Sequence, residues 1–76
     1  MKIFDDTDFI LQDIRHVSIV HKVPSSRTLF HTYALEARLK NGNWIGEIAL
    51  ANSEEELKVW WDITGSSASI VSEHEL

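Results

Sequence analysis

The chain has 76 residues and no cysteine, so one small domain must be stabilised by its core, alone or with a second copy, without disulfides or thiolate metal sites. The formal net charge of -5 argues against binding to nucleic acid or to anionic membranes, and it permits binding to basic protein surfaces. No apolar run approaches the roughly 20 residues that span a bilayer, and the N-terminus turns acidic at once, unlike a signal peptide, so we expect a cytoplasmic protein of a bacterium or of a host cell.

The N-terminal segment mixes short apolar runs with three aspartates, Asp5, Asp6 and Asp8. The apolar runs predict one or two short edge strands, with a turn at residues 5–7. The aspartates lack the glycine and the distal glutamate of a calcium-binding loop. We interpret them as part of an acidic surface that a basic partner could contact.

Residues 13–23 alternate between apolar and polar side chains, which predicts a strand with one buried face. The only proline follows directly, in VPSSRT, and it marks a loop to a second strand. Matching the apolar faces of the two strands predicts that Val17 lies near Leu35 and Ile19 near Tyr33.

Asn41-Gly42 stands between two apolar runs, which predicts a hairpin closed by a two-residue type I′ turn. In that register Leu39 faces Trp44, and Trp44 is expected to cap the core at the turn. The same register predicts further core-face pairs Ala37–Gly46, Leu35–Ile48 and Tyr33–Leu50, and opposite-face pairs Arg38–Ile45, Glu36–Glu47 and Ala34–Ala49.

Residues 53–63 are typical of a helix. Ser53 is a favourable N-cap, Glu56 completes a capping box, and Gly65 suits the C-terminal cap. We interpret residues 65–76 either as a flexible tail or as a segment that adds one short final strand. The predicted fold is therefore α+β: a single domain, 1–76, with an antiparallel sheet of about four strands and one helix on its apolar face.

No catalytic or nucleotide-binding motif is present, so we expect neither an enzyme nor a cofactor. The predicted registers align His16, Glu36 and Glu47 across the outer face of the sheet. This row is interpreted as a solvated surface with local charge balance, supplied by His16, by a neighbouring Lys or Arg, or by a cation. His21 and His31 are interpreted in the same way, as residues at the rim of the core, and no metal site is expected.

The helix carries five apolar residues over an arc of roughly 200°, which is wider than a sheet usually buries. Trp60 lies at the centre of this arc, so it is predicted to be the main core residue, while Val59 and Trp61 lie at the two margins. The margins could be covered by the tail, by a second copy or by a partner. The residues predicted to contact a partner are Trp61, Val59, Glu54, Glu55, Asp5, Asp6 and Asp8.

Three stretches, ILQDIRHVSIV, KNGNWIGEIAL and NSEEELKVWW, give the chain a layout that resembles short bacterial and phage proteins. In size and acidity it is also similar to phage inhibitors of bacterial defence, including anti-CRISPR proteins. The small size, the absence of a catalytic motif, the open sheet and the wide apolar arc predict a non-enzymatic protein-binding module. The resemblance implies that this module inhibits a bacterial defence complex. The alternative is a homodimeric structural or scaffolding protein.

Overall fold

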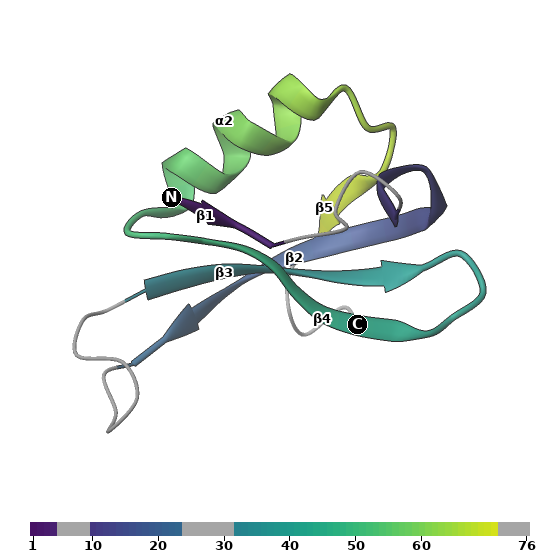
Figure 1. Ribbon diagram of the computed structural model, residues 1–76, viewed down its shortest axis with the longest axis horizontal. Coiled ribbons are helices and arrows are strands. Elements are labelled where there is room, and N and C mark those ends of the chain that lie inside the picture. The colour runs from purple at the N-terminus through teal and green to yellow at the C-terminus, as the bar shows by residue number, and fades with distance from the viewer. Residues whose placement is uncertain (5–9, 24–31, 72–76) are drawn as a thin grey trace.

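The structure is a computed structural model, and it describes residues 1–4, 10–23 and 32–71. Within these residues, one sheet of five strands carries a single α-helix across one face (Figure 1). The α+β class is thereby confirmed. Asp5, Asp6, Asp8 and His31 lie outside the described residues. The elements are β1 (Lys2–Ile3), the 3-10 helix η1 (Leu11–Asp13), β2 (Ile14–Lys22), β3 (Thr32–Leu39), β4 (Trp44–Ala51), α2 (Glu54–Thr64) and β5 (Ser69–Val71), and the strand order is β1-β4-β3-β2-β5.

The pair β2–β3 is antiparallel, as predicted, but its register differs by two residues. Val17 lies opposite Ala37, and Ile19 lies opposite Leu35. A shift of two residues leaves every side chain on its predicted face, because side chains alternate with a period of two. The long connection between the strands is the reason that the register could not be predicted from the turn.

The β3–β4 hairpin closes through a three-residue loop, so the predicted two-residue turn is wrong. Gly42 N–H donates to the Leu39 carbonyl at 2.9 Å, and Leu39 N–H donates to the Asn43 carbonyl at 2.8 Å. Gly42 has φ 94°, in the left-handed region. Loops of this kind place a glycine at their third position and form a bulge there.

Two further irregularities in β4 change which residues face each other. Ala37 lies opposite Gly46 and Glu36 opposite Glu47, as predicted. On either side of these central pairs β4 has one extra residue, Ile45 and Ile48, with no opposite residue on β3. Gly46, next to Ile45, has φ 84°. An extra residue in one strand shifts the pairing of all later residues by one position, so their side chains change face relative to the predicted register. The predicted pairs Leu39–Trp44, Arg38–Ile45, Leu35–Ile48, Tyr33–Leu50 and Ala34–Ala49 are therefore wrong, and the observed ones are Arg38–Trp44, Leu35–Ala49, Ala34–Leu50 and Tyr33–Ala51.

Because of the extra residue at Ile45, Trp44 lies on the face of the sheet opposite to the predicted one and does not cap the core. Trp44 lies opposite Arg38, and 56% of it is exposed. The core between α2 and the sheet consists of Ile14, Val17, Leu35, Ala37, Ile48, Ala49, Ala51, Leu57 and Trp61.

The helix α2 (Glu54–Thr64) lies within one residue of the predicted range 53–63 and has both predicted caps. Ser53 is the N-cap, and its Oγ accepts a hydrogen bond from the Glu56 N–H at 3.3 Å. At the other end Gly65 N–H donates to the Asp62 carbonyl. The described helices include none that is long and apolar enough to cross a membrane.

Both edges of the sheet are formed by short strands. β1 pairs antiparallel with β4, with Lys2 opposite Leu50. β5 pairs parallel with β2, with Ile70 opposite Val17. Of the two interpretations of the tail, the final strand is therefore the one observed, at Ser69–Val71.

Candidate functional site

Only one margin of the apolar arc of α2, the one with Leu57 and Trp61, packs against the sheet. The centre of the arc, at Trp60, lies at the edge of the contact between helix and sheet. Leu57 and Trp61 are the buried residues of the helix, and only 4% of Trp61 is exposed. Trp60 is half-buried, while Val59 and Ile63 are 55% and 76% exposed. The prediction that Trp60 is the main core residue and Trp61 a marginal one is wrong, and Trp61 is not available to a partner.

Trp61 is covered by the chain that follows the helix. Its indole N–H donates to the Ala68 carbonyl at 3.0 Å, just before β5. Thr64 adds a hydrogen bond from its hydroxyl to the Trp61 carbonyl, at 2.6 Å. Leu57, Trp61 and Thr64 have the i, i+4, i+7 spacing of one helix face. The sequence signal for the burial of Trp61 is therefore the stripe Leu57, Trp61 and Thr64, which has Trp61 at its centre.

On the outer side of α2 the exposed apolar residues line a shallow pocket of about 420 Å³. Val59 and Ile63 lie one turn apart on the helix, with Trp60 beside them. The N-terminal residue lies near the first turn of α2 (Figure 1). It also lines the pocket. We call this feature the α2 pocket, and its lining is Met1, Glu55, Glu56, Val59, Trp60 and Ile63.

One end of the α2 pocket is acidic. Glu55 is exposed, and no described cation lies within 4 Å of its carboxylate. The Glu56 carboxylate lies 4.0 Å from the Met1 amino group. Glu54 is exposed too, but it lies outside the pocket and pairs with Lys58 at 3.9 Å. Of the predicted partner-contact residues, Val59 and Glu55 therefore come together in one surface feature.

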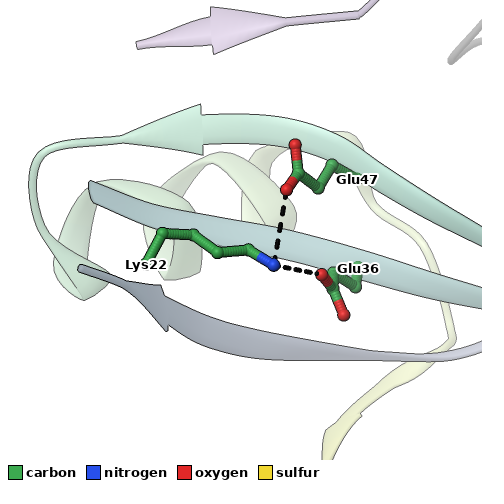
Figure 2. A network of polar contacts seen from close by, with 3 residues as sticks. All are labelled: Lys22, Glu36 and Glu47. Atoms are coloured by element: carbon green, nitrogen blue, oxygen red, sulfur yellow. Dashed lines mark hydrogen bonds and ion pairs between the residues drawn. The ribbon is translucent and has the colours of Figure 1, made fainter. Parts of the chain in front are cut away.

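The opposite face of the sheet holds a small charge network. Lys22 Nζ lies 3.0 Å from Glu36 and 3.5 Å from Glu47, between two glutamates that face each other across β3 and β4 (Figure 2). The hydrogen bond to Glu36 raises the pKa of Lys22 above its ordinary 10.5; the charges of both glutamates add to this and desolvation opposes it. Lys22 thus offsets one of the two negative charges of the pair.

His16 is not part of that row, because the two-residue shift places it opposite Arg38. Ser18 lies opposite Glu36. Among the described residues, neither its buried hydroxyl nor the buried His16 Nε2 has a hydrogen-bond partner. A nucleophile needs a hydrogen-bonded base, and these two atoms do not form such a pair. His21 stacks on Tyr33, with ring centroids 4.8 Å apart. Within the described residues no group of three or more His, Asp or Glu could hold a metal ion.

The α2 pocket is built by one helix and the N-terminal residue, and it joins an apolar surface to an acidic one. Of the predicted row on the sheet, Glu36 and Glu47 remain together and share the ammonium group of Lys22. Neither a protein-family model nor a curated protein nor a solved structure matches this chain.

Proposed function

We propose that this chain is a non-enzymatic protein-binding module that acts by occupying the surface of a partner with its α2 pocket. The observation that carries the proposal is the exposure of Val59 and Ile63 on the outer side of a helix that already buries Leu57 and Trp61. Contiguous apolar surface on a small domain is typical of an interaction site. The adjacent acidic end supplies a polar rim.

Trp60 takes the role that the sequence suggested for Trp61. It lines the α2 pocket, and its ring lies 5.9 Å from that of the buried Trp61, tilted by 53°. Packing against a core residue restricts the rotamers of Trp60 before a partner arrives, which lowers the entropy cost of binding. Tryptophan is enriched among the residues that contribute most to binding energy.

The form of this function implied by the resemblance is a phage-encoded inhibitor that covers a surface of a bacterial defence complex in the cytoplasm. Under the alternative, the pocket joins two copies of the chain into a scaffolding homodimer. Sedimentation at increasing concentration separates the two, because only the homodimer gains mass as the chain is concentrated.

The proposal is tested by the double substitution Val59→Ser and Ile63→Ser, used as bait in a pull-down from host lysate beside the unsubstituted chain. We expect the variant to lose the partner and to keep its thermal midpoint nearly unchanged, because both side chains are largely exposed. The matched control is Val23→Ser, which removes an equally apolar side chain, 65% exposed, outside the pocket. Retention of the partner by the double variant, or equal loss in the control, would contradict the proposal.

A further inference from the structure

We infer that the α2 pocket takes a basic segment of a foreign protein, in which a large apolar side chain lies about 12 Å from a Lys or Arg, and that it does not take a second copy of this chain. The inference rests on the proposed function and specifies the chemistry of the partner. It is carried by the arrangement of charge along α2 and by the apolar residues at the other end of the pocket.

The pocket has two chemically different ends. Glu55, Val59 and Ile63 follow each other at intervals of four residues, so they lie along one side of the helix. A rise of 1.5 Å per residue puts about 12 Å between the levels of Glu55 and Ile63. A ligand that fills the pocket therefore meets carboxylates at the first turn and apolar side chains at the last. An apolar anchor with a basic group at this offset contacts both ends.

The charge of the helix favours a cationic ligand. Within Glu54–Thr64 four carboxylates, Glu54, Glu55, Glu56 and Asp62, stand against the single cation of Lys58, which gives a net charge of -3. Lys58 lies beside Glu54, and the Met1 amino group lies beside Glu56, so Glu55 is the pocket carboxylate with no described cation within 4 Å. Three glutamates in the first turn also offset the positive end of the helix dipole.

The same charges disfavour a homodimer through the pocket. Two helices packed in parallel would bring two clusters of three glutamates together. Antiparallel packing would place those glutamates against a last turn that has no basic residue and contains Asp62. Like charges across an interface oppose association in both arrangements. A foreign basic segment has no such cost.

The inference is tested with a display library of random 12-residue peptides, panned in parallel on the unsubstituted chain and on the Val59→Ser, Ile63→Ser variant. We expect the peptides that bind only the unsubstituted chain to be enriched in Lys or Arg together with a Trp, Phe, Leu or Ile. For the best peptide, Glu55→Gln with Glu56→Gln should weaken binding about five-fold at low salt, with a smaller effect at high salt. The matched control Glu54→Gln, on the same turn but outside the pocket, should bind as the unsubstituted chain does.

The outcomes separate the two proposals. Neutral or acidic peptides that still require Val59 and Ile63 would overturn the inferred basic partner and leave the binding function standing. Absence of any peptide that distinguishes the double variant would overturn both. Dimers in sedimentation that the Val59→Ser, Ile63→Ser variant abolishes would show that the occupant is a second copy, and would also overturn the inference.

Discussion

Lys22 shows how one side chain makes an unfavourable strand pairing tolerable. Glu36 and Glu47 lie directly opposite each other, and like charges at such positions destabilise a sheet. Lys22 Nζ, on β2, contacts the carboxylates of Glu36 on β3 and Glu47 on β4. Lys22 therefore offsets part of the repulsion between the two glutamates, and the network links β2 to β3 and β4.

Replacing Lys22 with Gln should lower the free energy of unfolding by about 0.5–1 kcal/mol at neutral pH and low salt, because the two glutamates then repel without a counter-charge. The folded state raises the pKa of Lys22, so this stabilisation is complete below pH 10.5 and is lost as the pH rises through the raised pKa. Urea titrations of both chains at neutral pH and above pH 11 check this. The control Lys58→Gln, which disrupts an exposed pair within α2, should cost less. An effect that grows with rising pH would contradict the assignment.

At the scale of the elements, β4 is shaped by its two extra residues. The first one, at Ile45, is followed by Gly46 with φ 84°. This irregularity turns Trp44 to the face of Arg38 and away from the core. The position of an exposed tryptophan thus depends on a backbone conformation that few side chains adopt.

Gly46→Ala should cost about 1 kcal/mol, seen as a fall of about 4–8 °C in the thermal midpoint. Apart from Gly46 and its two chain neighbours, no heavy atom of the described residues lies within 4 Å of the added Cβ, so the cost is that of the left-handed backbone and not of a clash. Asn adopts this region more readily, and Gly46→Asn should therefore cost less than Gly46→Ala. A thermal midpoint that rises in the Ala variant would show that the positive φ is not required.

The contact between α2 and the segment before β5 is the second feature at this scale. Trp61→Phe removes the donor to the Ala68 carbonyl and leaves part of the core unfilled, so we expect a loss of about 2–3 kcal/mol. Amide exchange should quicken at Ile70 in the variant, because β5 loses its link to the helix. The half-buried Trp60 provides the matched control, and Trp60→Phe should cost under about 1 kcal/mol. Equal losses in the two variants would contradict the assignment of Trp61 as the core residue.

For the molecule as a whole, the sequence was sufficient where local chemistry decides the structure. The caps at Ser53 and Gly65 predicted the helix, and alternation predicted the strand β2. The prediction of a single buried face on β2 is wrong, because Ser18 and Val20 on the other face are buried too. The sequence was insufficient where distant parts of the chain meet. Two irregularities in β4 changed the hairpin pairing, and the tail decided which tryptophan is buried.

The candidate site follows the same division. The exposure of Val59 and the acidic first turn could be predicted, because they depend on positions around one helix. The sequence could not predict that Trp60 lines the pocket and that Trp61 is buried. Which tryptophan is buried depends on where the segment after the helix returns to the sheet. The participation of Met1 depends in the same way on where β1 pairs.

The parallel pairing of β5 with β2 also sets the order in which this domain can assemble. His16 and Ser69 lie opposite each other although 53 positions separate them in the chain, whereas the hairpin partners Arg38 and Trp44 are only six apart. Closing the longer loop costs more entropy, and contacts between distant residues slow folding. Docking of β5 is thus expected to be a late step. Until it occurs, Trp61 remains an exposed aromatic surface, and the incompletely folded chain is at its most prone to aggregate.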